Sequence, residues 1–356
     1  HVCTSRCLKG GEKERNSDAA FQLYCFYPAA LYLVNKKTKV QPMHIAIPAE
    51  VKNQEKRVAL TPEACRALAK AGHAVTVQAG AGKGAGFADD DYQQAGAALE
   101  ADISALYKNA GMIVKVKEPQ PAEWQHLTKQ HLLFCYLHLA AEPALADALK
   151  NIGLTAVAFE TVTRDEGTTP LLAPMSAVAG RLAVQLGTRF LHSPMGGRGQ
   201  LLGGILGTAT GHAVVVGAGV SGREAAHLAY SMGAKVTLLD INQQRLDAMQ
   251  AAYPEMRCVF STPEAISDIL PATDLLVGAV YITGKKAPHV VTEQQIKTMP
   301  EGSVAVDISI DQGGCIATSR PCTHDEPCFT KHGVIHSAIT NLPGAVPLAS
   351  SQALSD

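Results

Sequence analysis

The chain has 356 residues, enough for one large domain or two ordinary ones, and its composition excludes several classes of protein. Hydrophobic residues make up 47% and charged residues 18%, which is typical of a globular protein with a sizeable core. The 31 Lys and Arg balance the 32 Asp and Glu, which disfavours nucleic-acid binding. No apolar run approaches the roughly 18 residues of a membrane span, and nine cysteines without a regular framework favour a reducing compartment.

The first 42 residues differ from the rest of the chain because they show no sustained hydrophobic period. The stretch FQLYCFYPAALYLV resembles a signal peptide, but Pro28 interrupts it and no small-x-small cleavage site follows. We therefore interpret residues 1–42 as an extraneous or disordered extension, with a targeting segment as the alternative. Ordered patterning begins at Met43.

From Met43 onward, short apolar runs alternate with helical patterns. Thr61, Pro62 and Glu63 form a helix start, and Gly72 is a suitable residue to end that helix. The predicted strands are 44–47, 74–78, 112–116, 132–136 and 155–159, and the later predicted helices are 91–98, 102–109, 121–127 and 142–151. Buried strands separated by helices indicate a parallel sheet that is covered on both faces.

A second alternating unit follows a long helix that begins near Pro174. Its predicted strands are 212–216, 235–240, 275–280 and 304–309, with a helix over 220–233. The fold class is therefore α/β, with two Rossmann-like, doubly wound parallel-sheet domains and a cleft between them that holds the active site.

The strongest local motif is VVVGAGVSGREAA, in which Gly217, Gly219 and Gly222 form G-x-G-x-x-G between a buried strand and a helix. The first glycine permits the tight turn, the second lets the backbone approach a pyrophosphate, and the third allows the helix to pack closely on the strand. Asp240 ends the next strand, where an acid can bond the ribose hydroxyls. The pattern predicts a dinucleotide site, and the residues after Asp240 favour NAD over NADP because the first basic one is Arg245.

Polar residues also follow the ends of other predicted strands. Lys117, His138 and Asp311 each come just after a strand, and Arg57 lies on the loop after the first one. Singly, each could be a solvated loop charge. Ligands of open parallel sheets gather outside the carboxyl ends of the strands, so together these residues indicate a site. Lys115 is expected to share a side of its strand with Lys117.

The chain from Met43 resembles the alanine dehydrogenase family, within the larger group that includes the alpha subunit of nicotinamide nucleotide transhydrogenase. Stretches that carry the resemblance include IPAEVKNQEKRVALTP, IVKVKEP, LLAPMSAVAGRLA, MGGRGQLLGG, VVVGAGVSG and NLPGAVP. HLAA, DQGGC and TSRP are closer to the alanine dehydrogenase branch.

The resemblance implies NAD-dependent, reversible deamination of L-alanine to pyruvate and ammonium. Arg57 and Lys117 are then expected to hold the substrate carboxylate, His138 to act as acid and base, and Asp311 to help activate water. The expected cofactor contacts are Gly217, Gly219, Val220, Gly222, Asp240, Ser176, Val280, Asn341 and Leu342. Glycine or another small amino acid is an alternative substrate, because one methylene changes discrimination by only about 1–3 kcal/mol.

The same resemblance organises the chain into domains. It implies a substrate domain over 43–170 plus 348–356 and an NAD-binding domain over 171–347. Family members are commonly hexamers, so we expect a cytoplasmic homo-oligomer with small-molecule ligands, no nucleic acid and no membrane span. The family continues beyond SSQALSD, so a shortened substrate domain is also expected.

Several alternatives remain open at this point. Cys315, Cys322, His324 and Cys328 could form a zinc cluster, but their spacing fits no common ligand pattern, so no metal is expected. The segment 195–204 could hold a phosphate, although a flexible or packed interdomain loop is favoured. The alternative functions are a transhydrogenase-type NAD(H)-binding subunit and a non-catalytic NAD-binding fragment.

Overall fold

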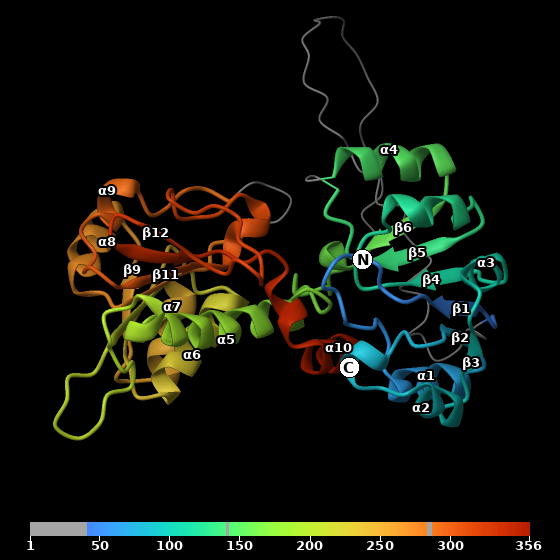
Figure 1. The fold of residues 1–356 in the computed structure, drawn as a ribbon, viewed down its shortest axis with the longest axis horizontal. Coiled ribbons are helices and arrows are strands. Elements are labelled where there is room, and N and C mark those ends of the chain that lie inside the picture. The colour runs from blue at the N-terminus through green and yellow to red at the C-terminus, as the bar shows by residue number, and fades with distance from the viewer. Residues whose placement is uncertain (1–40, 140–141, 283–286) are drawn as a thin grey trace, which may run out of the picture. The chain divides into compact units, whose positions relative to one another are not determined.

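Two β-sheets, each covered by helices, make up the part of the chain that the structure describes (Figure 1). The computed structural model describes residues 41–139, 142–282 and 287–356, so nearly all of the predicted N-terminal extension lies outside the described residues. Pro42–Asp356 form one compact unit that contains both sheets.

The first sheet has six parallel strands in the order β3-β2-β1-β4-β5-β6. Its strands are β1 His44–Ile47, β2 Ala74–Gln78, β3 Ala98–Glu100, β4 Met112–Val114, β5 Leu132–Cys135 and β6 Thr155–Ala158. The helices between them are α1 Pro62–Lys70, α2 Asp89–Gln94, α3 Ile103–Lys108 and α4 Pro143–Ile152, with short 3₁₀ helices η2 Lys83–Ala85, η3 Pro121–His126 and η4 Phe159–Thr161.

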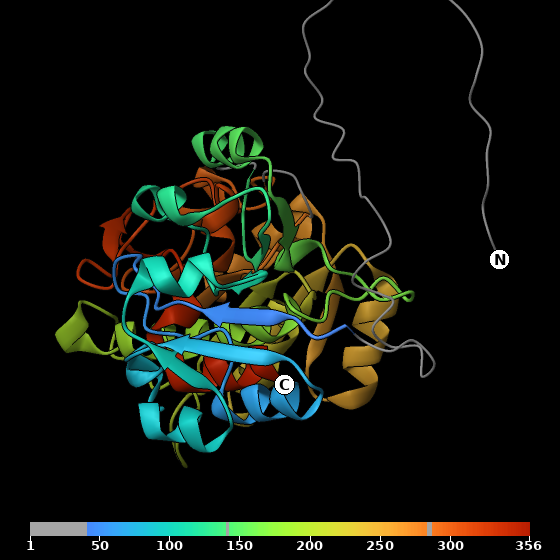
Figure 2. The ribbon, with the colours of Figure 1, turned by 90° about the vertical axis from the view of Figure 1, so that its right-hand side faces the viewer.

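Helices lie on both sides of this sheet (Figure 2), and alternating side chains are buried beneath them. Along β1, Ile47 packs with Val75 beneath α1 and α2, whereas Ala46 packs with Ile113 against α3 and α4. Helix α1 begins as predicted, because Thr61 accepts a hydrogen bond from the Ala64 N–H and a proline follows it.

The second sheet has seven strands in the order β12-β13-β11-β10-β7-β8-β9, and all neighbours are parallel except β12 and β13. Its strands are β7 His212–Val216, β8 Lys235–Asp240, β9 Arg257–Phe260, β10 Leu275–Gly278, β11 Val304–Asp307, β12 Phe329–Lys331 and β13 Val334–Ser337. The remaining helices are α5 Ala173–Phe190, α6 Val220–Ser231, α7 Gln243–Ala252, α8 Pro263–Ile269, α9 Glu293–Ile296 and α10 Pro347–Ser355, with 3₁₀ helices η5 Ser193–Met195, η6 Leu270–Ala272, η7 Ile308–Gln312 and η8 Leu342–Ala345.

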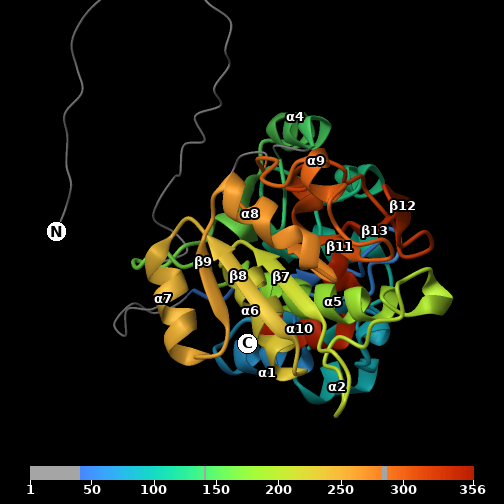
Figure 3. The same ribbon diagram turned by 90° about the vertical axis from the view of Figure 1, so that its left-hand side faces the viewer.

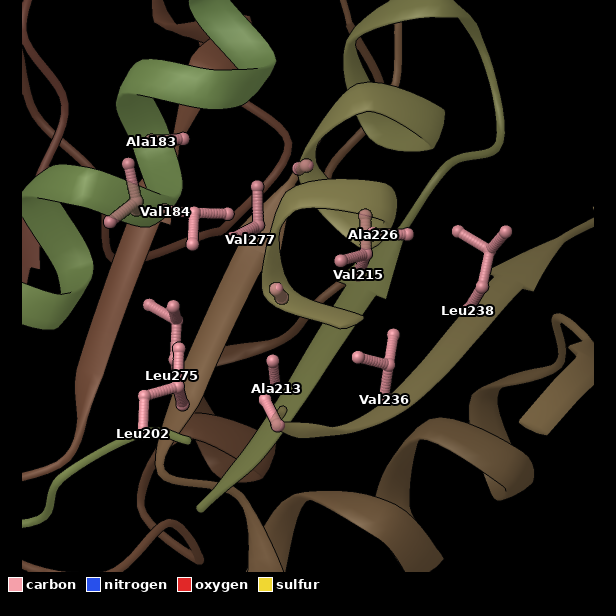
Figure 4. Packing of buried hydrophobic residues seen from close by; sticks show 14 of the residues in the cluster. Ala183, Val184, Leu202, Ala213, Val215, Ala226, Val236, Leu238, Leu275 and Val277 are labelled. Atoms are coloured by element: carbon pink, nitrogen blue, oxygen red, sulfur yellow. The ribbon is translucent and has the colours of Figure 1, made fainter. Parts of the chain in front are cut away.

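Helices α5 and α6 lie against the second sheet (Figure 3), and small side chains fill the contact between them (Figure 4). Ala183 of α5 and Ala226 of α6 share one cluster with Val215 of β7 and Val277 of β10. Where α5 meets α6, a Cβ added at Gly180 would lie 2.1 Å from the carbonyl oxygen of Ser221. That position therefore requires glycine for the two helices to approach.

Two parts of the predicted secondary structure are wrong. The helix predicted over 91–98 ends at Gln94, and residues 98–100 form β3, because Gly96 turns the chain at φ +91° and β2 then offers a pairing edge. The helix predicted near 121–127 is confirmed and is the 3₁₀ helix η3. The prediction for the second sheet also omitted β9, β12 and β13, whose pairing depends on partners distant in sequence.

Both sheets reverse their winding direction at a defined point. The reversal lies between β1 and β4 in the first sheet and between β7 and β10 in the second. Ligands of doubly wound sheets bind outside the carboxyl ends of the strands at such points. Within the described residues, none of the helices combines the length and apolar character needed to cross a bilayer.

Candidate active site

A pocket of about 140 Å³ lies where residues following strands of both sheets come together. Seven of the predicted site residues line it, namely Arg57, Lys117, His138, Ser176, Asp311, Asn341 and Leu342. The remaining lining residues are Tyr136, Leu172, Met175, Ala179, Ser221, Ala279, Tyr281, Ile308, Ser309, Gln312 and Pro343. Cations, an imidazole and a carboxylate are thus gathered beside apolar side chains, as in sites for small polar ligands.

Arg57 is fixed by a buried carboxylate that sequence analysis did not identify. Its Nε and one terminal nitrogen donate to the two carboxylate oxygens of Glu55 at 2.7 and 2.5 Å. The Asn341 side chain accepts from Arg57 at 2.7 Å and donates to Glu55 at 2.9 Å. This network joins the loop after β1 to the residue before η8.

The network limits which part of the Arg57 guanidinium a ligand can reach. Glu55 occupies the bidentate edge of the guanidinium, so a substrate carboxylate cannot use that fork. The other terminal nitrogen contacts the Met175 sulfur at 3.2 Å on the pocket wall. A ligand can therefore meet Arg57 only through this end.

Lys117 is buried in the pocket wall with 8% of its surface exposed. Burial and the neighbouring Arg57 charge lower the pKa of its ammonium group, against the effect of Asp311 and Glu118. Lys115 differs from it, because Lys115 is fully buried in ion pairs with Glu50 and Glu123 and does not line the pocket. Strand β4 ends at Val114, so both lysines follow the strand. Although they were expected on the same side of it, their side chains have different surroundings.

His138 follows β5 and adopts a left-handed backbone conformation with φ +46°. Its imidazole stacks on the Tyr136 ring, with centroids 5.9 Å apart and planes 9° from parallel. Burial and the Lys117 charge lower the pKa of His138, whereas Glu160 and Asp311 oppose that shift. A neutral imidazole can accept a proton at neutral pH.

Asp311 belongs to η7, which directly follows β11. Both of its carboxylate oxygens accept from the Asn341 N–H at 3.4 Å, and Asn341 itself has φ +56°. Buried Asp307 holds this turn by accepting from the N–H groups of Ser309 and Cys315. Asp311 is exposed within the turn, so its carboxylate can meet solvent water.

The glycine motif lies as predicted between β7 and α6. A Cβ added at Gly222 would lie 1.6 Å from the Gly217 oxygen, and one added at Gly217, which has φ +106°, would lie 2.5 Å from the Ala279 oxygen. A Cβ at Gly219 meets nothing within 4 Å, so space is open at the N-terminus of α6. Packing therefore requires Gly217 and Gly222, whereas Gly219 leaves room for a pyrophosphate. These residues fit a dinucleotide.

Asp240 is buried at the end of β8 and holds two backbone groups. Its oxygens accept from the Ala218 N–H at 2.5 Å and from the Asn242 N–H at 2.7 Å, and Arg245 lies 3.8 Å away. Asn242, and not Asp240, caps α7. Gly217, Gly219, Val220, Gly222, Asp240 and Val280 do not line the pocket, but Ser221 and Ala279 beside them do.

Several residues at the site were missed by sequence analysis. Glu55 lies two residues before Arg57, and Glu160 follows β6 just as His138 follows β5. The rule that strand ends carry ligands would have selected Glu160, whereas nothing local singles out Glu55. Tyr136, Met175 and Gln312 also line the pocket, and their types alone carry no signal.

Two further motifs, the segment 195–204 and the set Cys315, Cys322, His324 and Cys328, do not line the pocket. In the segment 195–204, the Arg198 N–H donates to the Gly302 oxygen and the Arg198 side chain pairs with Asp274, at the starts of β11 and β10 and not at their carboxyl ends. This segment packs against the second sheet, where Leu202 joins the buried cluster. Across 41–139, 142–282 and 287–356, no three His, Cys, Asp or Glu side chains are grouped as metal ligands.

The ion pair of Glu55 predicts acid sensitivity of the fold. Burial raises the pKa of Glu55, but Arg57 and Asn341 outweigh it and lower the value from 4.5 to about 2. Because the folded-state pKa is depressed, the stability is present above about pH 4.5 and is lost as pH falls toward 2. At about 1.4 kcal/mol per unit, the pair contributes about 3 kcal/mol.

We expect Glu55→Gln to lower the free energy of unfolding by about 3 kcal/mol at neutral pH, because Arg57 loses its buried partner. The difference from the wild type should shrink between pH 4.5 and 2. Urea unfolding over this pH range measures it, with exposed Glu63→Gln as the matched control. If the free energy of unfolding depended on pH in the same way in the wild type and in Glu55→Gln, the lowered pKa of Glu55 would be contradicted.

Two doubly wound sheets, a glycine-rich turn and a pocket with cations and an imidazole define the class of nicotinamide-nucleotide-binding α/β proteins. Family models described as alanine dehydrogenase/PNT match residues 46–179 for the N-terminal domain and 183–356 for the C-terminal domain. The chain belongs to this alanine dehydrogenase/PNT family.

Individual relatives agree with this membership. An alanine dehydrogenase from Halomonas elongata is 49% identical over 88% of this chain and 85% of the relative. A solved L-alanine dehydrogenase superposes with a TM-score of 0.84 at 46% identity, over 88% of this chain and 86% of that one. A transhydrogenase from Sinorhizobium meliloti has a TM-score of 0.78 at 24% identity, over 88% and 90% of the two chains, and shares the fold.

Proposed function

We propose that the protein is an NAD-dependent dehydrogenase that reversibly converts L-alanine and water to pyruvate and ammonium. The observation that carries this proposal is the pocket itself, where Arg57, Lys117, His138 and Asp311 lie together beside the start of α6. Its high identity to alanine dehydrogenases supports the same activity. The domain limits given above, 43–170 with 348–356 and 171–347, are part of the proposal.

NAD binds along the second sheet, with its pyrophosphate at Gly217, Gly219, Val220 and Gly222 and its adenosine ribose at Asp240. Ser176, Val280, Asn341 and Leu342 are the proposed contacts on the nicotinamide side. When bound, NAD supplies the acceptor for the hydride that leaves the substrate. The chain contributes binding and orientation, because the N-terminus of α6 favours negative charge and Gly219 leaves its backbone accessible.

Lys117 and the free end of Arg57 bind the substrate carboxylate. Lys117 forms no ion pair within the described part of the chain, unlike Lys115, so its charge is available to a ligand. Burial lowers the pKa of Lys117, and an anionic ligand offsets that cost by favouring the charged form. Glu55 keeps Arg57 in place without occupying the end near Met175.

His138 moves protons and Asp311 orients water. The lowered pKa of His138 keeps its imidazole neutral at neutral pH, ready to take a proton from the substrate amine or from water. The hydrogen bonds from the Asn341 N–H to the Asp311 oxygens are long, at 3.4 Å. These oxygens can therefore also accept a hydrogen bond from water. With hydride removal to NAD, proton transfer by His138 and water held by Asp311 meet the needs of converting an amine and water to a ketone and ammonium.

The apolar wall suits a small side chain. Leu172, Met175 and Tyr136 line the pocket beside the cations. The Tyr136 hydroxyl donates its hydrogen bond to the Leu171 carbonyl oxygen. A methyl group can pack here, whereas a polar side chain would lose its hydrogen bonds. Alanine is the proposed substrate, and glycine is the nearest competitor because one methylene is worth only about 1–3 kcal/mol.

The test is reductive amination by the purified protein. Pyruvate, ammonium and NADH should be consumed together, measured as loss of NADH absorbance, with glyoxylate and omission of ammonium as comparisons. No turnover by a folded preparation that binds NADH would overturn the proposal. Hydride transfer to a second nicotinamide nucleotide without pyruvate would instead favour the transhydrogenase-type function. The homo-hexameric assembly and cytoplasmic location implied by the resemblance remain proposals.

A further inference from the structure

The Glu160 carboxylate accepts hydrogen bonds from the backbone that carries His138, and among the described residues these are its side-chain bonds. The Glu160 oxygens accept from the His138 N–H at 2.8 Å and from the Leu137 N–H at 3.3 Å. Glu160 belongs to η4, which follows β6, and β6 pairs with β5 in register Cys135↔Ala158. The two strand ends therefore place Glu160 beside His138 from an adjacent strand.

The backbone at this point is unfavourable without a partner. His138 has φ +46°, a left-handed conformation that a residue with a side chain seldom adopts and that costs free energy. Two successive N–H groups that converge on one oxygen pair form a concave anion site. Glu160 occupies that site, and it forms no ion pair with a cation within the described residues.

We propose that Glu160 is a positioning residue for His138, whose carboxylate holds the Leu137–His138 backbone in its strained conformation and thereby keeps the imidazole stacked on Tyr136 at the pocket. This inference rests on the proposed function, in which His138 is the acid and base. Glu160 does not line the pocket, so it acts through His138 and not on the substrate.

The influence of Glu160 on His138 can be measured through the pKa of the imidazole, which the surrounding charges shift. Lys117 and Glu118 face it from the segment after β4, Asp311 from η7 and Glu160 from η4. Burial and Lys117 lower the pKa of His138, and Glu160 is the first of the groups that raise it. Removing the Glu160 charge should therefore move the titration of His138 to lower pH, which a role only in folding would not do.

Glu160→Gln tests the proposal because glutamine keeps the size but loses the charge and one of the two acceptor oxygens. We expect kcat to fall about 10- to 100-fold, as for a misplaced catalytic group, with little change in the KM for NADH. The acidic limb of the pH–rate profile should move to lower pH. Glu166→Gln is the matched control, since Glu166 is exposed and its side chain accepts a hydrogen bond from the Thr168 hydroxyl, away from His138.

A second readout does not depend on turnover. The imidazole signal of His138, assigned by its loss in His138→Ala, is titrated by NMR in the wild type and in Glu160→Gln. A lower His138 pKa in the variant supports the proposal even if the wild type does not turn over alanine, an outcome that would overturn only the proposed function. An unchanged His138 titration overturns the positioning role, whether or not activity is lost.

Glu160→Asp covers the case in which Glu160→Gln does not fold. Aspartate keeps the charge but withdraws the carboxylate by one methylene, so the Leu137 and His138 N–H groups lose their close acceptor. The pH–rate profile should then stay near that of the wild type while kcat falls. Wild-type kcat in Glu160→Asp would show that the backbone needs no such support and would overturn the proposal.

Discussion

Replacing His138 with alanine is expected to lower turnover of alanine by about 100- to 10,000-fold, the range that general acid–base catalysis contributes. The side chain faces the pocket from the end of β5, and no other histidine lines that pocket. NADH binding should survive, because the glycine motif belongs to the second sheet and has no contact with His138. Steady-state kinetics and NADH fluorescence titration measure the two quantities separately.

The role of His138 also predicts how wild-type activity depends on pH. Burial and Lys117 lower the pKa of His138 from 6.5, so activity in deamination should fall only as pH drops below that value. His324→Ala is the matched control, because His324 is exposed and outside the pocket. Near-normal turnover in His138→Ala would show that the acid–base assignment is wrong.

Replacing Asp240 with alanine should reduce the preference for NAD over NADP by about 100-fold. In the proposed complex with NAD, the buried Asp240 carboxylate would accept hydrogen bonds from the adenosine ribose and would repel a 2′-phosphate. Arg245 lies 3.8 Å from Asp240, so loss of the carboxylate leaves a guanidinium free to meet that phosphate. The Michaelis constant for NAD should rise, while that for alanine changes little.

The contacts of Asp240 with the protein call for a second variant. Alanine leaves the Ala218 and Asn242 N–H groups without their acceptor, which loosens the glycine-rich turn. Asp240→Asn keeps one acceptor oxygen and isolates the effect of charge, and exposed Asp247→Ala is the control on α7. Steady-state kinetics with NAD and with NADP measure the cofactor preference of each variant. An equal kcat/KM for the two cofactors in the wild type would refute the role of Asp240 in selecting NAD.

Local sequence was sufficient to predict the α/β architecture and the charged residues of the pocket. Buried strands can be recognised by their apolar runs, and helix starts such as Thr61-Pro62 by their own hydrogen-bonding needs. Parallel strands all end at the same edge of a sheet, so polar residues after those ends are expected to meet. This is why Lys117, His138 and Asp311, far apart in the chain, could be assigned to one site before any coordinates.

Tertiary structure decided what each charge is bonded to. Arg57 was expected to hold a substrate carboxylate, and the structure adds that Glu55 pairs with one edge of its guanidinium, while Asn341 closes the network from 284 positions away. Strand β3 likewise forms only because β2 presents an edge. Hydrophobic periods and turn residues are determined by neighbours in sequence, whereas ion pairs and strand edges depend on strand order and on the distances that packing imposes.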